Sequence, residues 1–538
     1  MGTTPTDRIS AVRPARSGRG AGRGAGRGAG RSAARDSRPP TFLLVMALAV
    51  TALCLVPLGF IVVSTLTAGW DTVHRLVFRA RVGELLVNTG LLVVLSCTAT
   101  AVVGTAAAYL VERLRVAGYR VWGPLLVAPL AIPAFVTSYG WVSVFPGIDG
   151  LFGATLIMTL AYFPFVYLPV AAALRGLDPA WEEQARTLGL RPRAVFLRVV
   201  LPQLRPAILG GAMLVGLHCL SEFGAFSMLR FSTFTTAIYD QYSSSFASAA
   251  ANMLAVVLVA CCLILVTSES WLAGRARRAR LGSGAARRPE PMRLGSRQIP
   301  AQAFLVVLVG AALAVPLSSV MYWLVRGSGE WAQALATSVT TIGLAATGAV
   351  VTVVLAFPVA YLSVRYRSVL TTMMERLSYL AGALPSIVVA LALITVTIRF
   401  ARPIYQSVVT LIAAYVLLFL PRAMVTLRSA LLQAPPELED AARALGVKPA
   451  ATLARVVLPL AAPGIFSAAA LVFIAGATEL TATLLLAPIG TTTLATRFWS
   501  LTGSIDYVAA APYAAMMILI SAPVTYLLLQ KSRKVRGR

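Results

Sequence analysis

The chain has 538 residues, of which 58% are apolar and 12% are charged, and its mean hydropathy is +0.79. This composition excludes an ordinary set of soluble domains and predicts a polytopic membrane protein whose main solvent is lipid. The 47 Lys and Arg exceed the 20 Asp and Glu, but the basic residues gather in the tails, one linker and short loops, where they indicate membrane topology rather than nucleic-acid binding.

The first segment, residues 1–40, carries nine Arg within Gly- and Ala-rich low-complexity sequence. It is too polar to pack and contains no apolar core of its own. It therefore predicts a disordered cytoplasmic tail rather than a cleaved signal peptide.

Twelve apolar runs follow, each near the ~20 residues that a helix needs to cross a bilayer. The first repeat, 41–271, holds runs at 41–66, 85–111, 122–145, 151–174, 207–229 and 250–271. After a basic linker, 272–300, the second repeat, 301–530, holds runs at 301–325, 335–363, 376–398, 404–427, 464–487 and 508–530, and a basic tail, 531–538, ends the chain. The predicted fold class is an all-α polytopic membrane protein with two tandem six-helix repeats, and the positive-inside rule places both termini and the linker in the cytoplasm.

The two halves match each other residue by residue. A shift of 257 superposes Glu182/Glu439, Ala185/Ala442, Arg186/Arg443, Leu188/Leu445, Gly189/Gly446, Pro192/Pro449, Arg198/Arg455, Pro206/Pro463, Ile208/Ile465 and Glu222/Glu479, together with VVLP at 199–202 and 456–459. Ala108-Tyr109-Leu110 matches Ala360-Tyr361-Leu362 at a shift of 252. Because each copy has an even number of spans, the repeats are parallel, and the translocation path is expected between the halves.

The strongest match is a loop after the fourth span of each half, at 178–208 and 435–465. Pro near the start, acidic residues in the first turns and Gly at the end predict a cytoplasmic helix of roughly ten residues in each copy. Its apolar positions have i, i+4, i+7 spacing, which favours one face lying in a groove, although this face could instead pack on the protein's own helices or on lipid headgroups. These positions are Trp181, Ala185 and Leu188 in the first copy and Leu438, Ala442 and Leu445 in the second.

The segments EEQARTLGLRPRAVFLRVVLP and EDAARALGVKPAATLARVVLP resemble the EAA loop of type I ABC importer permeases. That pattern runs Glu-Ala-Ala, three residues, Gly, nine residues, Ile-x-Leu-Pro. The matching residues are Glu183, Ala185, Gly189, Leu201 and Pro202 in the first copy and Asp440, Ala441, Ala442, Gly446, Leu458 and Pro459 in the second. The departures are Gln184 for Ala, Asp440 for Glu, and Val199 and Val456 for Ile.

The resemblance implies that each loop carries a coupling helix seated in a cytoplasmic ABC ATPase. The expected coupling residues are Trp181, Glu182, Glu183, Ala185, Leu188, Gly189, Leu438, Glu439, Asp440, Ala442, Leu445 and Gly446. It also implies two ATPase copies, an extracytoplasmic substrate-binding protein and a location in the bacterial inner membrane. The dipeptide Gly-Lys of a Walker A loop does not occur in the chain, so ATP-Mg is expected on the partner subunit, and no cofactor is expected on this one.

Two acids, Glu222 and Glu479, lie deep in the predicted fifth and eleventh spans at equivalent positions. Ionisable groups at membrane depth are candidates for a translocation path or gate, although each could simply accept hydrogen bonds within the bundle or lie near the outer interface. Two histidines cannot form a metal cage by themselves, and the five cysteines lack metal-ligand spacing, so no metal site is expected.

The cargo is predicted from the resemblance alone. The fused two-copy architecture and the segments SEFGAFSMLRFSTFTTAIYD and TELTATLLLAPIGTTTLATRFW resemble bacterial ferric-iron permeases. Thiamine, phosphonate and polyamine permeases share the loop and stay as alternatives. An ion-coupled secondary transporter, with broken intramembrane helices that bind ions, is the alternative from another class, and a membrane-embedded enzyme is a more distant one.

Overall fold

The computed structural model describes residues 40–178, 180–243, 248–273, 295, 298–327, 330–366 and 368–534. The tail at 1–39, nearly all of the linker at 274–297 and the last four residues lie outside this part of the chain. Every regular element in the described ranges is helical, with no strand among them.

The helices of the first half follow the predicted runs closely. They are α2 (Thr41–Ala68), α3 (Trp70–Val77), α4 (Ala80–Ala108), α5 (Tyr119–Leu125), α6 (Ala134–Val144), α7 (Gly150–Tyr162), α8 (Pro164–Gly176), α9 (Ala180–Thr187), α10 (Pro192–Val195), α11 (Leu201–Ser221), α12 (Gly224–Met228), α13 (Phe234–Ser243) and α14 (Ser248–Ala273). A π-helical turn, η2 (Tyr109–Arg113), extends α4.

The helices of the second half repeat this order. They are α15 (Gln298–Val309), α16 (Val315–Arg326), α17 (Trp331–Arg365), α18 (Val369–Ala381), α19 (Ser386–Phe400), α20 (Val408–Gln433), α21 (Pro436–Ala444), α22 (Pro449–Thr452), α23 (Leu458–Ala477), α24 (Thr481–Leu486), α25 (Leu494–Gly503) and α26 (Tyr507–Lys534). Eight helices of the described chain are long and apolar enough to span a bilayer, or up to 11 if each bent pair is one span, and the apolar stretch Tyr507–Pro523 of α26 adds a shorter candidate.

The third predicted span of each half is broken rather than straight. The chain bends by 93° between Ala131 and Ala134 and by 105° between Ala381 and Ser386. Pro133 and Pro385, which are equivalent at the shift of 252, stand directly before the helices that follow these bends. Because proline has no N–H to donate and disfavours a helical residue before it, it ends the preceding helix and begins the next.

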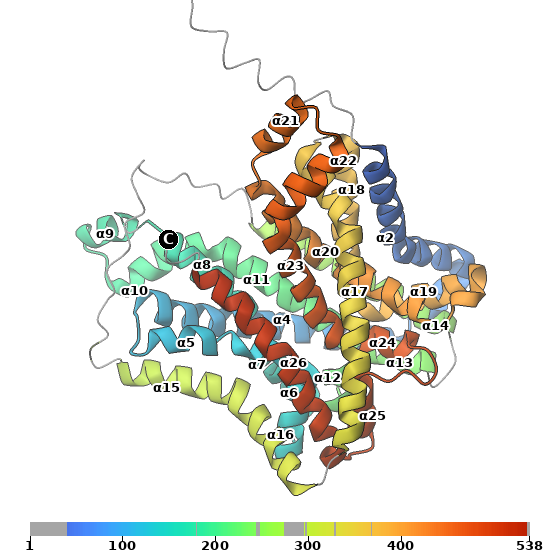
Figure 1. Cartoon of the computed structure of the whole chain (residues 1–538). Helices are drawn as coiled ribbons and strands as arrows, with labels where there is room; N and C mark the ends of the chain where they lie inside the picture. The colour runs from blue at the N-terminus through green and yellow to red at the C-terminus, as the bar shows by residue number, and fades with distance from the viewer. Residues whose placement is uncertain are drawn as a thin grey trace, which may run out of the picture.

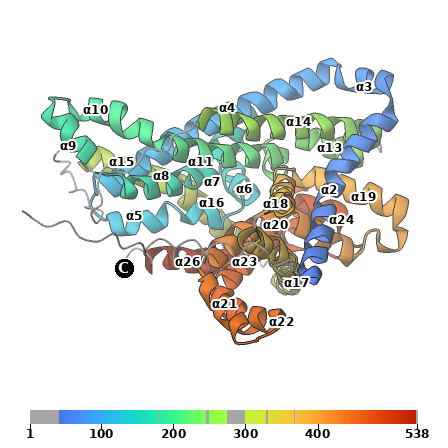
Figure 2. The ribbon, with the colours of Figure 1, turned by 90° about the horizontal axis from the view of Figure 1, so that it is seen from above.

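The halves exchange their first spans. Helix α2 packs against α17, α18 and α19 of the second half, while Leu305 and Leu308 of α15 belong to the apolar core of the first half. Figure 2 shows α2 among α17, α18 and α19 of the second half. At the crossing of α16 and α6, a Cβ on Gly140 would lie 2.6 Å from Cα of Pro316, so only glycine permits this close approach. The compact bodies of the fold therefore differ from the two sequence repeats.

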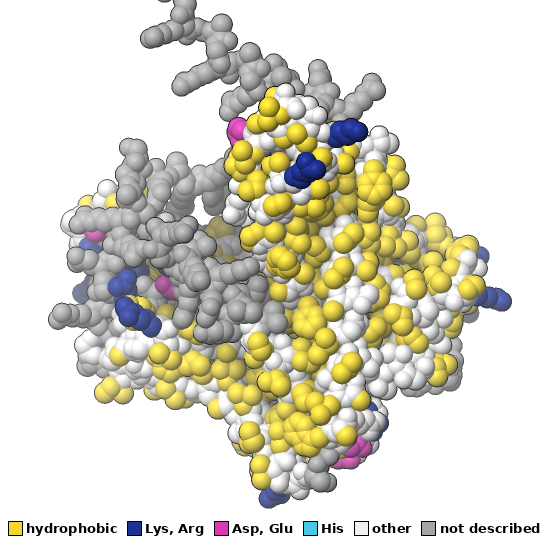
Figure 3. All heavy atoms as spheres, viewed as in Figure 1, with side chains coloured by type: hydrophobic (Ala, Val, Ile, Leu, Met, Phe, Trp, Pro, Cys, Tyr) yellow, Lys and Arg dark blue, Asp and Glu magenta, His cyan; other side chains and the backbone are white. Residues whose placement is uncertain are grey.

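The surface matches a lipid-facing protein. Apolar side chains cover most of α17 and α23 on the face drawn in Figure 3, and Lys and Arg appear near the ends of these helices. Exposed Val339, Val350 and Val354 continue this apolar surface along α17. An apolar exterior of this kind is stable in hydrocarbon, where backbone groups must be bonded within the helices.

Candidate functional site

The two matched loops form short helices, α9 and α21, in the upper part of Figure 1. The Asp178 carboxylate accepts a hydrogen bond from the Ala180 amide at 3.1 Å at the start of α9, and Pro436 occupies the first turn of α21. Gly189 and Gly446 follow the helices with φ of 80° and 76°, which is the left-handed region that favours glycine. The glycine stop is thus present in both copies, and the predicted proline start is present in the second.

The adjacent acids of each loop point in opposite directions. Glu182 is buried and pairs with Arg113, whose side chain is 4% exposed, and the Glu183 side chain is exposed. In the second copy Glu439 is 4% exposed and accepts from Arg365 Nε at 2.7 Å, whereas Asp440 is exposed. The inner acid of each loop therefore binds a distant segment of its own chain, and the outer acid is exposed. Asp440 also pairs with Arg443 within α21, at 3.2 Å.

Arg113 and Arg365 are the residues that the sequence analysis missed. They are equivalent at the shift of 252 that pairs Ala108-Tyr109-Leu110 with its copy, and each ends the second span of its half. Arg365 also donates to the carbonyl of Ala434 at 2.9 Å. The matched tyrosine Tyr361 donates to Glu439 at 2.9 Å. Extending the match at a shift of 252 by three residues, beyond Leu110 and Leu362, would have found both arginines.

The spacing predicted that the apolar positions of α9 and of α21 share one face, but in the structure they do not. Ala185 and Ala442 are buried against the chain itself, while Leu188 and Leu445 are 82% and 83% exposed. The inward Glu–Arg pair determines the rotation of each helix, since a buried carboxylate must face its cation. Trp181 and Leu438 are also exposed. Each helix therefore exposes two large apolar side chains, which are Trp181 and Leu188 on α9 and Leu438 and Leu445 at α21.

The fifth span of each half carries the matched VVLP segment near its start and contains a π-helical turn. These turns, η4 (Phe196–Val200) and η8 (Leu453–Val457), lie directly before the Leu-Pro pairs. The amide of Leu201 donates to Phe196 O, and that of Leu458 to Leu453 O, in the i to i−5 pattern. A π turn often marks a functional site in a helix.

Glu222 and Glu479 do not lie within continuous spans. Helix α11 ends at Ser221 and α23 at Ala477, and each carboxylate accepts a hydrogen bond from the first turn of the next short helix. These bonds are Ala225 N to Glu222 Oε1 at 3.0 Å and Ala482 N to Glu479 Oε1 at 3.1 Å. Both acids therefore cap helix breaks at equivalent places, which satisfies amides that the breaks leave free.

The two breaks meet at the interface between the halves. A Cβ on Gly224 would lie 2.6 Å from Cδ2 of Leu480, and the charges of Glu222 and Glu479 act on each other. The hydroxyl of Tyr162 contacts Glu222 at 3.4 Å. The partly accessible carboxylates thus lie on opposite sides of the interface at which the path was predicted.

The surroundings of this carboxylate pair differ between the halves. In the first half His218 packs on Tyr162 and Phe165, with ring centroids 4.8 Å apart in each case. In the second half Arg422, whose charge acts on Glu479, takes the place equivalent to Phe165. Arg422 lies inside the predicted span 404–427, so the rule that singled out the two glutamates should also have singled it out.

An aromatic cluster adjoins the carboxylate pair. Phe223, next to Glu222 in the chain, has its ring centroid 4.5 Å from that of Tyr239 on α13 and 5.9 Å from that of Trp499 on α25. Tyr239 and Trp499 occupy corresponding places in the two halves and lie edge to face at 5.7 Å. Aromatic contacts between the halves thus cover the interface beside the carboxylates.

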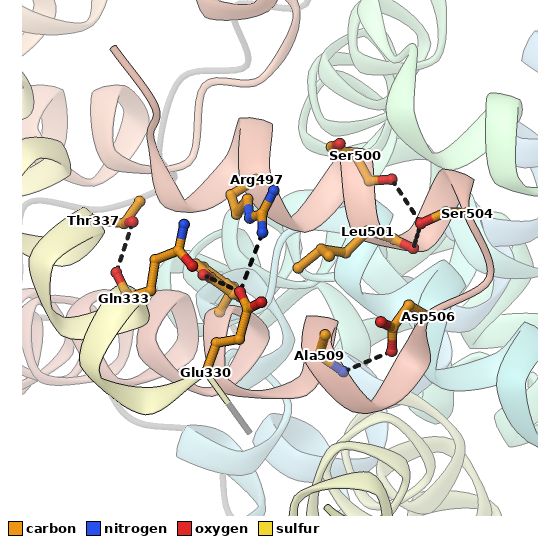
Figure 4. Close-up of polar contacts among 10 residues, drawn as sticks. Glu330, Gln333, Thr337, Arg497, Ser500, Leu501, Ser504, Asp506 and Ala509 are labelled. Atoms are coloured by element: carbon orange, nitrogen blue, oxygen red, sulfur yellow. Dashed lines mark hydrogen bonds and ion pairs between the residues drawn. The ribbon is translucent and has the colours of Figure 1, made fainter. Parts of the chain in front are cut away.

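Polar contacts hold α25 in place, as Figure 4 shows. Arg497 binds Glu330, just before α17, at 3.2 Å. Tyr513 of α26 donates to the same carboxylate at 3.1 Å, and Asp506 accepts from Ala509 N at 3.0 Å. The helix that carries Trp499 is therefore bonded to the start of α17.

The described residues contain no group of three or more His, Cys, Asp or Glu that could hold a metal ion. Buried thiols are found at Cys54, Cys219 and Cys262. The arrangement offers two short amphipathic helices, α9 and α21, at one end, a carboxylate pair between the halves, and an aromatic cluster beside that pair.

Comparisons with known proteins agree with this arrangement. The model of the family "Binding-protein-dependent transport system inner membrane component" matches residues 100–278 and 348–537. The Fe(3+)-transport system permease protein FbpB 2 of Haemophilus influenzae is 36% identical over 91% of this chain and 98% of its own length. A probable ABC transporter permease, y4fN of Sinorhizobium fredii, is 26% identical over 79% of this chain and 81% of its own length. The sulfate transport system permease protein CysT of Salmonella typhimurium is 27% identical over 44% of this chain and 94% of its own length.

The broken helices alone would also suit a secondary transporter, but two matches to the family model, covering most of the chain, decide between the classes. The chain therefore belongs to the binding-protein-dependent transport system inner membrane component family, as a fused, two-copy permease subunit of an ABC importer rather than an enzyme.

Proposed function

We propose that this permease moves ferric iron, delivered by an extracytoplasmic binding protein, into the cytoplasm across the bacterial inner membrane. The observation that carries the proposal is the 36% identity, over nearly the full length of both chains, to a permease named for Fe(3+) transport. The sulfate permease resembles less than half of this chain. Two carboxylates with one nearby Arg would also repel a sulfate dianion and favour a cation.

Two copies of a cytoplasmic ATPase are proposed to bind α9 and α21, one at each helix. The exposed Trp181, Leu188, Leu438 and Leu445 would enter apolar clefts of the ATPase, and the exposed acids Glu183 and Asp440 would meet its basic groups. ATP and Mg²⁺ would be bound there, so this chain needs only a different affinity for two states of its partner.

We propose that both termini lie in the cytoplasm, on the side of α9 and α21, as the basic tails indicate. Helices α9 and α21 and the C-terminal end of α26 lie in the upper part of Figure 1, while α25 lies toward the bottom. Glu222 and Glu479 would then line the path, with the aromatic cluster on the extracytoplasmic side. Because oxygen ligands suit hard cations, the two carboxylates could transiently bind ferric iron during passage.

Transport in proteoliposomes tests the proposal. The permease is reconstituted with its ATPase and binding protein, and ATP-driven uptake of radioactive ferric iron is compared with uptake of sulfate. Iron uptake, without sulfate uptake, is expected. The Glu222→Gln and Glu479→Gln variants keep an oxygen that can accept the capping hydrogen bond, so they should fold normally and transport iron more slowly. Sulfate uptake without iron uptake would refute the proposed cargo.

A further inference from the structure

Helix α17 is bonded at one end to α21, where the ATPase is proposed to bind, and at the other end to α25, which carries part of the aromatic cluster. It runs from Trp331 to Arg365, and its 35 residues correspond to about 52 Å of helix. Pro358 lies within it but does not interrupt it. A single helix therefore extends from the aromatic-cluster end of the molecule to the coupling-helix end.

At the coupling end, Arg365 joins three elements. Its Nε binds the buried carboxylate of Glu439 on α21 at 2.7 Å, and its Nη2 donates to the carbonyl of Ala434 after α20 at 2.9 Å. Because both Arg365 and Glu439 are largely buried, separating them would leave an uncompensated charge. Displacement of α21 should therefore displace the end of α17 as well.

At the other end, α17 binds α25 through two contacts. Glu330 pairs with Arg497 at 3.2 Å, and the buried hydroxyl of Thr341 accepts from the Leu494 amide at 2.9 Å. Helix α25 carries Trp499, which contacts Tyr239 across the interface. If α17 shifts along its axis or rotates about it, these contacts should therefore displace α25 and with it Trp499 of the aromatic cluster.

The first half has a corresponding arrangement. The π turn after α4 carries Arg113, which pairs with the buried Glu182 of α9. Near the start of α4, Arg81 donates to the Ser232 hydroxyl and Asn88 to the Ser232 carbonyl, each at 3.2 Å. Ser232 precedes α13, which carries Tyr239. The same connection thus occurs in both halves of the repeat, although different residues form it at the end near the aromatic cluster.

We propose that α17 and α4 transmit movement of the coupling helices to the Tyr239–Trp499 contact, with Arg365 and Arg113 as the positioning residues that make the connection. This inference rests on the proposed binding of ATPase subunits to α9 and α21. The outward acids Glu183 and Asp440 serve the ATPase contact, whereas the inward acids Glu182 and Glu439 serve transmission within this chain.

The test follows the distance across the aromatic cluster in the complete complex. Spin labels are placed at Asp240→Cys and Ser500→Cys, exposed positions that follow Tyr239 and Trp499. Distances between labels are measured without nucleotide and after trapping with ATP, Mg²⁺ and vanadate. Arg365→Gln is compared with Arg365→Lys and with the charge exchange of Arg365→Glu with Glu439→Arg, while Asp440→Asn is the matched control on the outer face.

The unmodified pair should show a distance that shifts on trapping. In Arg365→Gln the ATPase should still copurify and hydrolyse ATP, but the shift should be lost, and the charge exchange should restore it. Asp440→Asn should weaken ATPase copurification without abolishing the shift in the complexes that form. A full shift in Arg365→Gln, or no rescue by the charge exchange in a folded complex, would overturn the inference. Failure of the unmodified permease to bind ATPase would instead overturn the proposed function, and this inference with it.

Discussion

Neighbouring acids of α9 should respond very differently to the same substitution. Glu182→Gln removes the charge that neutralises Arg113, in a pair whose side chains are 8% and 4% exposed. Breaking one partner of a buried pair costs about 3–5 kcal/mol. Glu183→Gln makes the same chemical change at an exposed side chain, where electrostatic contacts contribute at most about 1 kcal/mol.

Hydrogen exchange of the backbone amides of residues 180–190 measures this difference. A cost of about 3 kcal/mol corresponds to a rise of more than 100-fold in the population of the open loop. In Glu182→Gln the protection should fall by at least about 100-fold, or to the level of an unstructured peptide if that limit is reached first. Glu183→Gln should leave protection within about 5-fold of the parent. Equal effects of the two substitutions would refute the assignment of inward and outward roles.

Two further substitutions test the contacts between the halves. Gly140→Val should destabilise the α6–α16 crossing by about 1–3 kcal/mol because its Cβ would overlap Pro316. As the control, Gly343→Ala lies at a helical site with nothing within 4 Å and should not destabilise the protein. Thermal unfolding in lipid nanodiscs measures both variants, and an unchanged midpoint for Gly140→Val would contradict the crossing. Trp499→Ala removes two ring contacts of about 0.5–1.5 kcal/mol each. It should raise the basal rate of ATP hydrolysis, measured without the binding protein, by about 5-fold or more. Trp331→Ala is the control, and a basal rate of Trp499→Ala equal to that of the parent would show that the cluster does not restrain the complex.

Much of the fold was predictable because its signals are local. Apolar length predicted the spans, and Gly189 and Gly446 marked the helix ends through their left-handed backbone. The bends at Pro133 and Pro385 were missed because the apolar content of a segment does not indicate whether its helix axis is straight or bent. The prolines themselves were a readable signal.

The site was predictable only in part, since its geometry depends on contacts between distant residues. The repeat identified Glu182 and Glu439 but not their inward orientation, which depends on Arg113 and Arg365 some 70 residues earlier in the chain. Glu222 and Glu479 were found by charge at membrane depth, yet their capping role needs the helix breaks that the hydropathy of the spans does not reveal. The exchange of first spans has no local sequence signal at all.

That exchange has a consequence for biosynthesis. Helix α2 packs on α17, α18 and α19, whose residues leave the ribosome more than 260 positions after Ala68. At about 5–20 residues per second, α2 waits roughly 10–50 s in the bilayer before these second-half partners exist. Helix α2 tolerates this interval because its backbone groups are bonded internally and α14 of the first half already packs on it. Helix α15, by contrast, meets a first half that has already been made, so final assembly depends on translation of the second half.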